Sequence, residues 1–284
     1  MVSQSAKLRS LLSEGKTLVA PGVHNGLYAK LMGHLGFGTL YMGGAQCNYS
    51  HGFPDLSVRN MEEVSRDVYE ITAAIDLPVI VDADTGYGNP LNVRRTVQVF
   101  EAAGAAALHL EDQPYEQKRS PTLRDVRLIS EAEMVMRIKA AVDARRDDNF
   151  MIIARTDAVP AEGMARALER MHAYVEAGAD GVFVNGPESE EQYAIIPKEF
   201  QVPTVALMSR ASLARTFSLA QLQDWGYAIC IMPLDPLLVG LRVVVDSMNE
   251  FRETGRIDHM LDSQFGHRDL LKILGVDDWL RLVD

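Results

Sequence analysis

Two aspartates lie two positions apart at the end of a short apolar run. Asp82 and Asp84 follow the run 78–81 and precede a glycine-rich turn. Side chains alternate along a strand, so residues two apart point the same way. Neighbouring carboxylates repel each other unless a proton or a cation lies between them. The pair therefore indicates either a cation site or a turn in which both carboxylates bind backbone amides.

A third carboxylate, Glu111, ends the next apolar run, 106–111. In a barrel of parallel strands the carboxyl ends meet at one mouth, so Glu111 is expected beside Asp82 and Asp84. Three carboxylates without Cys or His favour a hard, hydrated cation, Mg²⁺ or Mn²⁺, over zinc. We predict that these three residues bind the metal. His109, two residues before Glu111, is expected either near the metal or buried and hydrogen-bonded.

A permanent positive charge is expected at the same mouth. Arg155 closes the apolar run 150–155. A guanidinium there can bind both oxygens of a substrate carboxylate. Its alternative role is an ion pair with Asp157 or Glu111.

Glycines and polar side chains also follow the run that contains Tyr41. Gly43 and Gly44 would let backbone amides approach a ligand oxyanion, although a plain turn has the same sequence. Asp55 is expected to orient metal-bound water or to cap a turn, and Tyr41 to hydrogen-bond the substrate or to pack. Cys47 is a conceivable nucleophile in the loop after Gly44, but no basic residue neighbours it, which favours a structural role.

Short apolar runs alternate with amphipathic segments almost from end to end, the pattern of a parallel sheet covered by helices. The expected strands are 17–20, 39–42, 78–82, 106–111, 150–155, 181–184, 203–206 and 228–232. The expected helices are 5–13, 27–35, 61–75, 92–103, 131–144, 163–177, 189–196, 219–225 and 236–253. Eight strand–helix units in 284 residues predict an α/β fold of the (β/α)8 TIM-barrel type. A doubly wound open sheet is the alternative, although no strand leads into Gly-x-Gly-x-x-Gly.

One barrel domain over residues 1–284 is the economical interpretation. The segment 5–13 precedes the first strand and is expected to plug the bottom of the barrel. The tail from about residue 256 to 284 carries apolar clusters around Leu270 and Trp279 but no further strand. We therefore expect the tail to pack on another surface, such as a second subunit.

Charge and composition exclude several classes of protein. The chain has 39 acidic and 28 basic side chains, a formal net charge of −11, and its Lys and Arg are scattered. Such a surface repels nucleic acid. No stretch approaches the roughly 20 apolar residues of a membrane span, and two cysteines are too few for a disulfide framework. We expect a cytoplasmic protein in a reducing compartment, with a small-molecule carboxylate as its partner and neither nucleic acid nor membrane.

At these residues the chain resembles the isocitrate lyase/phosphoenolpyruvate mutase superfamily. The shared motifs are Tyr41-x-Gly-Gly, Gly-x-Pro-Asp55, Val-Asp82-Ala-Asp84-x-Gly-Tyr-Gly-Asn, His109-Leu-Glu111-Asp-Gln, Ile-Ile-Ala-Arg155-Thr-Asp-Ala and Tyr174-x-x-Ala-Gly-Ala-Asp-Gly. The resemblance implies a β/α barrel with Mg²⁺ in its mouth and a last helix exchanged between the subunits of a dimer or homotetramer. It implies that Asp84 holds the metal directly, with Asp82, Asp55 and Glu111 acting through waters. It also implies that Gly43, Gly44 and Arg155 bind the substrate carboxylate.

The chain departs from the family pattern in the loop after the fourth strand. Lyases of this family carry Lys-Arg-Cys-Gly-His there, whereas this loop reads Gln117-Lys118-Arg119-Ser120-Pro121-Thr122. The acidic thiol is missing, and a serine hydroxyl is far too weak an acid to replace it. Lys118 is a candidate catalytic residue, as a proton donor or charge clamp; its alternative is solvated surface.

Three further positions differ from the family. The family's serine before Gly-Gly is Met42, its Glu after the sixth strand falls at Asn185, and its Asn after the seventh falls at Leu207. These changes remove groups that would bind the second carboxylate of a large tricarboxylate, so isocitrate and methylisocitrate are poor candidates. Asn185 is retained as a candidate substrate-binding residue.

The resemblance implies a Mg²⁺-dependent lyase that cleaves a carbon–carbon bond of a small 2-hydroxy or 2-oxo dicarboxylate through a metal-stabilised enolate. One alternative is phosphonopyruvate hydrolase or phosphoenolpyruvate mutase-like carbon–phosphorus chemistry, because the Asp-Thr-Gly-Tyr-Gly-Asn run occurs in that branch too. Oxaloacetate decarboxylase is another. A barrel that binds a ligand without catalysis is the third, motivated by the missing Cys, Glu and Asn.

Overall fold

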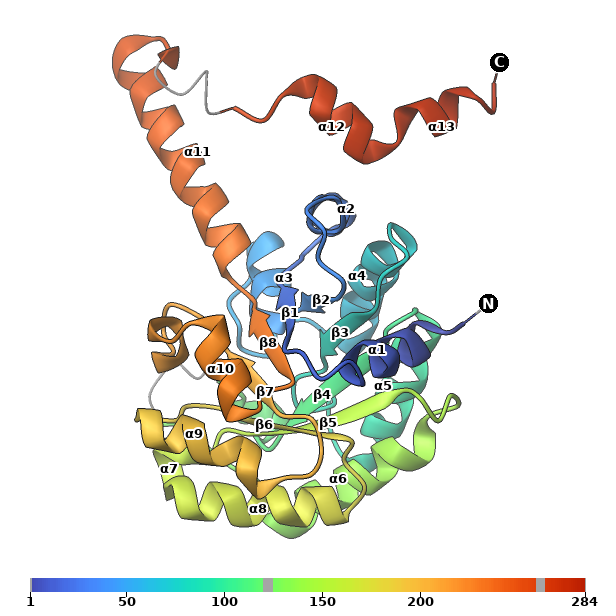
Figure 1. Ribbon diagram of the computed structural model, residues 1–284, viewed down its shortest axis with the longest axis vertical. Coiled ribbons are helices and arrows are strands. Elements are labelled where there is room, and N and C mark those ends of the chain that lie inside the picture. The colour runs from blue at the N-terminus through green and yellow to red at the C-terminus, as the bar shows by residue number, and fades with distance from the viewer. Residues whose placement is uncertain (1, 120–124, 259–263, 284) are drawn as a thin grey trace.

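The fold is built on parallel strands connected by helices (Figure 1). The computed structural model describes residues 2–119, 125–258 and 264–283. Within these ranges the strands are β1 (Leu18–Pro21), β2 (Leu40–Met42), β3 (Val79–Asp82), β4 (Ala107–Glu111), β5 (Met151–Thr156), β6 (Gly181–Val184), β7 (Val205–Leu207) and β8 (Ile229–Met232). Each lies within two residues of its predicted ends, because the apolar runs that mark the strands are the segments buried on both faces.

The strands close into a ring. One hydrogen-bonded sheet has the order β2-β3-β4-β5-β6 and the other β1-β8-β7, all parallel. A bridge between Gly22 and Tyr41 joins β1 to β2, and a bridge between Val182 and Thr204 joins β6 to β7. The predicted α/β barrel is therefore confirmed, and the alternative of a doubly wound open sheet is wrong.

The helices that cover the barrel are α2 (Gly26–His34), α4 (Met61–Ala73), α5 (Pro90–Ala102), α6 (Glu131–Ala144), α8 (Met164–Glu176), α9 (Glu190–Glu199) and α10 (Leu219–Trp225). Most begin at a residue that the sequence supplies for this purpose. Asn60, Asn89 and Ser218 form capping boxes, in which the side chain accepts an amide of the first turn. Helix α10 ends at Gly226, whose backbone is left-handed, and α4, α5 and α8 end at alanines.

Two apolar cores hold this arrangement. The inner core fills the barrel and includes Ile80, Ile153 and Ile231, while the outer core lies between strands and helices. Helix α1 (Gln4–Leu12) contributes the fully buried Leu8 to the inner core. The first helix thus closes the barrel, as predicted.

Helix α9 runs three residues beyond its predicted end, through Pro197. Proline deprives the carbonyl four residues earlier of its helical partner, which is why the prediction ended before it. That carbonyl belongs to Tyr193, and it accepts a hydrogen bond from the Tyr227 hydroxyl at 3.0 Å. A tertiary contact therefore replaces the missing helical one.

Four short elements occupy segments expected to be irregular: α3 (Gly44–Ser50), α7 (Val159–Glu162), η1 (Tyr115–Gln117) and η2 (Leu213–Thr216). Periodicity cannot indicate helices of one or two turns. The placement of Cys47 in a loop is consequently wrong, since it lies within α3 and is buried.

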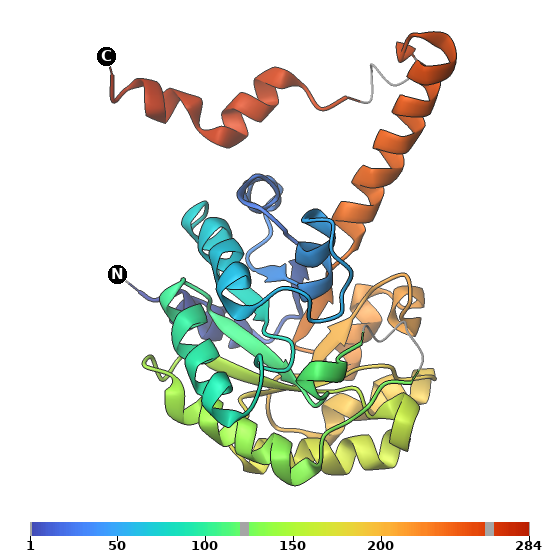
Figure 2. The ribbon, with the colours of Figure 1, turned by 180° about the vertical axis from the view of Figure 1, so that it is seen from behind.

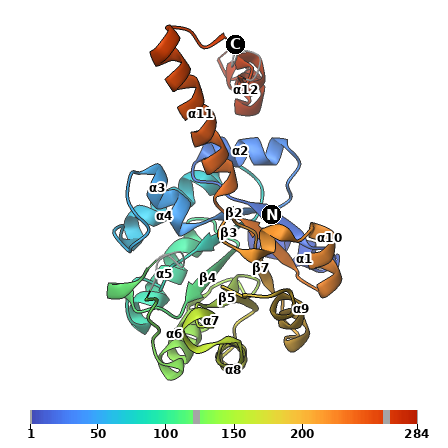
Figure 3. The same cartoon turned by 90° about the vertical axis from the view of Figure 1, so that its left-hand side faces the viewer.

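The C-terminal helices lie outside the barrel. Helix α11 (Asp235–Thr254) projects away from it and has no buried residue, while α12 (His267–Leu274) and α13 (Val276–Leu280) run back across the top of the view (Figure 2). Helix α12 lies against α2, and the side view shows both on the same side of the barrel (Figure 3). Among the described residues, no helix has the length and apolarity needed to span a bilayer.

Candidate functional site

A cavity of about 580 Å³ opens at the carboxyl ends of the strands. Eight of the predicted site residues line it: Tyr41, Gly43, Gly44, Asp55, Asp82, Lys118, Arg155 and Asn185. Asp84 and Glu111 lie just behind the lining, and both are buried. The strand-end pattern therefore brings together residues that are separated by up to 144 positions in the chain.

The Asp82 carboxylate is held by the turn that follows β3. Its Oδ1 accepts the amide of Asp84 at 2.9 Å, and its Oδ2 accepts the amide of Gly44 at 3.1 Å. Burial alone would raise the pKa of Asp82, but His109, Arg155 and Lys118 lower it to about 2. One of the two roles expected for this pair of aspartates was the binding of backbone amides. Asp82 has that role. The Gly44 amide is directed at Asp82 in this state and is not free for a ligand.

Asp84 has a different environment from Asp82. Its backbone is left-handed, with φ of 47°, which is uncommon outside glycine and is typical of functional sites. Its Oδ1 is buried without a hydrogen bond of good geometry, and its neighbour is the Lys118 ammonium at 2.8 Å. Burial, with the charges of Asp82 and Asp55, raises the pKa of Asp84 to about 6 even though Lys118 opposes the shift.

Glu111 ends β4 and is completely buried. Neither carboxylate oxygen accepts a hydrogen bond, although Oε2 lies 3.1 Å from Nη2 of Arg155. Burial raises the pKa of Glu111 well above its ordinary value despite that arginine. Leaving buried carboxylate oxygens without a hydrogen bond costs free energy, so Glu111 remains a candidate for ligand or metal binding.

Arg155 is fastened by Asp157, two residues further along the chain. Its Nη2 donates to both oxygens of Asp157, at 3.1 and 3.2 Å, and its Nε lies 3.3 Å from Oδ1. The ion pairs with Asp157 and Glu111, the alternative role of Arg155, are therefore present. Its Nη1 is 4.0 Å from Asp82 Oδ2, too far for a hydrogen bond, so this nitrogen remains available to a carboxylate in the cavity.

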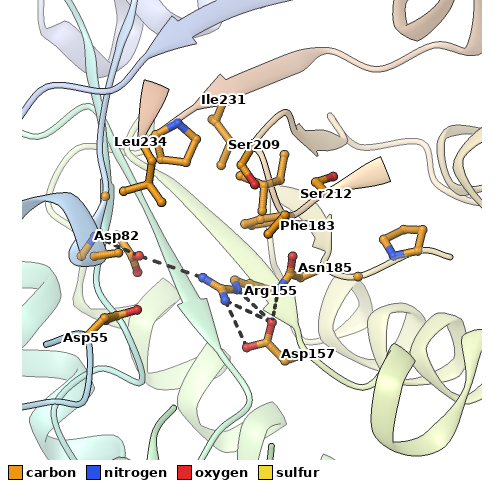
Figure 4. A pocket seen from close by; sticks show the side chains of 18 of the residues that line it. Asp55, Asp82, Arg155, Asp157, Phe183, Asn185, Ser209, Ser212, Ile231 and Leu234 are labelled. Atoms are coloured by element: carbon orange, nitrogen blue, oxygen red, sulfur yellow. Dashed lines mark hydrogen bonds and ion pairs between the residues drawn. The ribbon is translucent and has the colours of Figure 1, made fainter. Parts of the chain in front are cut away.

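The Asp157 carboxylate is also bound from two other strand ends. Asn185, after β6, donates to its Oδ1 at 2.6 Å, and Gln113, after β4, donates to its Oδ2 at 2.7 Å. Figure 4 shows Asn185, Asp157 and Arg155 linked in this way beside Asp82 and Asp55. Asn185 therefore lies at the predicted place, with its amide nitrogen engaged by Asp157.

Sequence reasoning missed Asp112, which supports this network from below. Its fully buried carboxylate accepts hydrogen bonds from the Thr156 hydroxyl at 2.7 Å, the Asp157 amide at 3.0 Å and the Tyr174 hydroxyl at 3.0 Å. The sequence signal that could have identified Asp112 is its position directly after Glu111, at the end of the same strand. Side chains alternate across a strand, so Asp112 faces the helices while Glu111 faces the mouth.

His109 and Tyr41 form a buried pair inside the mouth. The Tyr41 hydroxyl and Nε2 of His109 are 2.8 Å apart and hydrogen-bonded. Burial lowers the pKa of His109 to about 4, with Asp82 opposing the shift, so the ring is neutral. Its Nδ1 lies 3.5 Å from Asp82 and makes no hydrogen bond. His109 thus lies near the carboxylates, and only one of its two ring nitrogens is hydrogen-bonded.

Lys118 belongs to the site rather than to the solvated surface. Its side chain is 2% exposed, and its ammonium pairs with both Asp55 and Asp84. Residues 120–124 of the same loop lie outside the described part of the chain. They include Ser120 to Thr122, which belong to the segment that differs from the family motif.

The opposite wall of the cavity is apolar. Phe183, Leu207, Ile231 and Leu234 line it, together with the hydroxyls of Ser209 and Ser212 (Figure 4). Leu207 therefore contributes an apolar side chain to the cavity wall. Such a wall excludes water and strengthens electrostatic interactions within the cavity.

The acidic residues fit a hydrated hard cation better than a metal enclosed by protein. Among the described residues, no group of three or more Asp, Glu, His or Cys side chains is placed so that it could hold a metal ion, so Asp82, Asp84 and Glu111 do not form a three-carboxylate metal site in this arrangement. A hard cation such as Mg²⁺ needs only one or two carboxylates because it keeps several waters. Asp84 and Glu111 have carboxylate oxygens that accept no hydrogen bond and could provide them. Asp55 shares its positive neighbour Lys118 with Asp84, and Asp82 shares Arg155 with Glu111.

Comparison with known proteins identifies the family. Residues 8–252 match the family described as phosphoenolpyruvate phosphomutase. A curated relative, 2,3-dimethylmalate lyase of Eubacterium barkeri, is 38% identical over 277 residues, covering 97% of this chain and 96% of the relative.

Solved structures agree with this match. The structure of oxaloacetate acetylhydrolase with 3,3-difluorooxalacetate has a TM-score of 0.93 and 30% identity, covering 99% of this chain and 96% of that one. Phosphonopyruvate hydrolase in complex with oxalate and Mg²⁺ has a TM-score of 0.88 and 27% identity, covering 99% and 98%. A 2,3-dimethylmalate lyase, described as a superfamily member, has a TM-score of 0.91 and 31% identity, covering 99% and 95%. The chain therefore belongs to the phosphoenolpyruvate phosphomutase family, within the PEP mutase/isocitrate lyase superfamily.

Proposed function

We propose that this protein is a Mg²⁺-dependent lyase that cleaves a carbon–carbon bond of a small 2-hydroxy or 2-oxo dicarboxylate. The observation that carries the proposal is the convergence in the barrel mouth of buried carboxylate oxygens that accept no hydrogen bond, on Asp84 and Glu111, with Lys118 and Arg155 as their positive neighbours. The similarity to 2,3-dimethylmalate lyase and oxaloacetate acetylhydrolase supports it.

In this proposal Asp84 holds the metal directly, and Asp55, Asp82 and Glu111 hold it through waters. Bound Mg²⁺ supplies a Lewis acid that neutralises the negative charge developing on the substrate oxygens. The presence of Mg²⁺ and oxalate in phosphonopyruvate hydrolase supports this choice of ion. Mn²⁺ suits the same oxygen ligands.

The chain's own residues bind and orient the substrate. Arg155 offers Nη1 to a substrate carboxylate, while Asp157 and Glu111 hold the rest of the guanidinium in place. The other substrate-binding candidates also line the cavity: Tyr41, Gly43, Gly44, Asp82 and Asn185. A guanidinium nitrogen held in a fixed direction favours an anionic carboxylate oxygen, which fits a dicarboxylic substrate.

Cleavage of a 2-hydroxy acid removes the hydroxyl proton and breaks the bond between C2 and C3. The bonding pair goes to C3, which then takes a proton, so that a 2-oxo acid and a shortened carboxylate leave. Lys118 has a pKa raised well above its ordinary value, because Asp84, Glu111 and Asp55 outweigh the effect of burial. An ammonium that holds its proton so firmly serves as a charge clamp, and Asp55 positions it.

The second candidate is carbon–phosphorus chemistry on phosphonopyruvate. The observation that favours it is the likeness to phosphonopyruvate hydrolase over nearly the whole of both chains. Oxaloacetate decarboxylation would use the same carboxylate and metal site. A barrel that binds without catalysis is a weaker candidate, because buried carboxylate oxygens that accept no hydrogen bond are costly to keep without use.

The test is Mg²⁺-dependent release of pyruvate, glyoxylate, oxalate or phosphate from a panel of malates, citramalate, 2,3-dimethylmalate, methylisocitrate, oxaloacetate and phosphonopyruvate. Asp84→Ala is expected to abolish turnover, whereas Asp224→Ala, an exposed aspartate outside the cavity, serves as the matched control. Phosphate release would favour the second candidate. Full activity of Asp84→Ala would refute the metal-dependent mechanism, and turnover of any substrate would exclude a non-catalytic barrel.

We further propose that the barrel and its tail form one domain that works as a homo-oligomer, a dimer or tetramer in which the last helices are exchanged. The support is the apolar surface that these helices leave exposed, on α11 at Val239, Val244 and Phe251 and on α13 at Trp279. Two free, buried cysteines agree with a reducing compartment such as the cytoplasm. Light scattering on the purified chain would give the number of subunits, and a monomer would refute the exchange.

A further inference from the structure

A lysine side chain lies where a cation would be expected among the acidic residues. Lys118 directly follows η1, in the loop after β4, and its side chain is 2% exposed. Its Nζ is 2.8 Å from Asp84 Oδ1, and the same Nζ also pairs with Asp55 Oδ1. The ammonium thus contacts carboxylates from the ends of two different strand–loop units.

The electrostatic surroundings favour a positive charge at this point. The ammonium pairs with Asp55 and Asp84, and the carboxylates of Asp82 and Glu111 are buried in the same mouth. An uncompensated cluster of buried carboxylates would be costly, because like charges repel strongly at low dielectric. The lysine therefore stabilises the acidic residues in the state described here.

The same oxygen cannot serve both cations. Asp84 Oδ1 accepts no hydrogen bond of good geometry, and it faces Lys118 at 2.8 Å. A divalent ion bound to this oxygen would lie within a few ångströms of the ammonium, where two positive charges repel. Metal binding and the Lys118–Asp84 ion pair therefore compete.

We infer that the Lys118 ammonium neutralises Asp55 and Asp84 in the metal-free protein, and that a divalent cation bound at Asp84 would displace it. The inference rests on the proposed metal-dependent function and assigns a regulatory role to one of its residues. Lys118 is thus a built-in counter-ion that lowers the affinity for metal. Once displaced, the ammonium remains at the cavity wall, where it can act on the substrate.

The experiment measures Mn²⁺ binding to the full-length protein from the loss of the electron paramagnetic resonance signal of free Mn²⁺. The variant is Lys118→Met, which keeps the length of the side chain and removes its charge. Lys139→Met changes an exposed lysine on α6 in the same way and is the matched control. Lys118→Arg keeps the charge and serves as the second variant if the methionine destabilises the fold.

Lys118→Met is expected to bind Mn²⁺ at least about tenfold more tightly than the wild type, because one opposing charge is gone. Lys118→Arg and Lys139→Met are expected to bind as the wild type does. Binding by the wild type with no gain in Lys118→Met would overturn this inference and leave the metal site standing. No binding by any of the proteins would overturn both the metal site and the inference.

A second measurement follows the ammonium itself. Lysines are modified by reductive methylation without metal and with saturating Mn²⁺, and the modified fraction of Lys118 is determined by mass spectrometry of peptides. We expect low modification without metal and a clear rise when Mn²⁺ binds, with Lys139 unchanged. Modification of Lys118 that stays at the metal-free level when Mn²⁺ is bound would overturn the inference.

Discussion

Arg155 and Asp157 lie two residues apart after the same strand, and the Asp157 carboxylate binds the Arg155 guanidinium through both of its oxygens, at 3.1 and 3.2 Å from Nη2. Asn185 and Gln113 donate to these same oxygens. The aspartate is therefore surrounded by donors, and it fixes the direction in which Nη1 of Arg155 faces the cavity.

Replacing Asp157 with Asn is expected to lower kcat/KM by roughly 10- to 100-fold, the equivalent of about 1.5–3 kcal/mol for hydrogen bonds to a charged group. The new amide group would meet another N–H donor, from Arg155, Asn185 or Gln113, and the guanidinium would lose its fixed orientation. Steady-state kinetics on the substrate found in the panel checks this. Unchanged kinetics would show that Arg155 is oriented without Asp157.

Gly44→Ala is expected to impair metal binding while the fold is kept. A Cβ at this position would lie 3.0 Å from Asp84 Oδ1 and 3.2 Å from Asp82 Oδ2, closer than ordinary contacts. The carboxylates would have to move apart, so we expect Mn²⁺ affinity to fall by about tenfold or more. Gly38→Ala is the control, because a Cβ there meets only Leu11 Cδ1 at 3.9 Å. Equal Mn²⁺ affinity in both variants would contradict the prediction.

Asp112→Asn is expected to destabilise the protein by about 1–3 kcal/mol, because an amide group would replace an acceptor that binds three donors in a buried place. Urea unfolding measures the change. Tyr174→Phe removes one of the three donors and should therefore cost less. If both variants unfolded at the wild-type urea concentration, the network would be shown to add nothing to stability.

Cys47→Ala is expected to retain the wild-type kcat. Cys47 is 1% exposed within α3, and burial raises the pKa of its thiol well above the ordinary value, which removes the thiolate that a nucleophile needs. The native protein should react with thiol reagents slowly at both Cys47 and Cys230, whose pKa burial raises to about 11. A large loss of kcat in Cys47→Ala, with a normal melting temperature, would restore Cys47 as a catalytic candidate.

The amino-acid sequence alone determined the order of strands and helices, because apolar runs buried on both faces and amphipathic segments are local patterns. Strand ends then located Asp82, Asp84, Glu111 and Arg155 at one mouth. Local patterns failed where a distant group decides the outcome. Helix α9 continues through Pro197 because Tyr227, 34 residues after Tyr193, supplies the hydrogen bond that proline removes.

Only the tertiary structure decided how the charges pair. The two aspartates look equivalent in the sequence. Asp82, however, accepts hydrogen bonds from two backbone amides, whereas Oδ1 of Asp84 accepts no hydrogen bond and forms an ion pair with Lys118. The pairing of Lys118 with Asp55 brings together residues 63 positions apart, and the support of Asp157 by Asp112 and Asn185 spans three strand ends. Such pairings depend on burial and distance in space, and neither can be read from residue spacing along the chain.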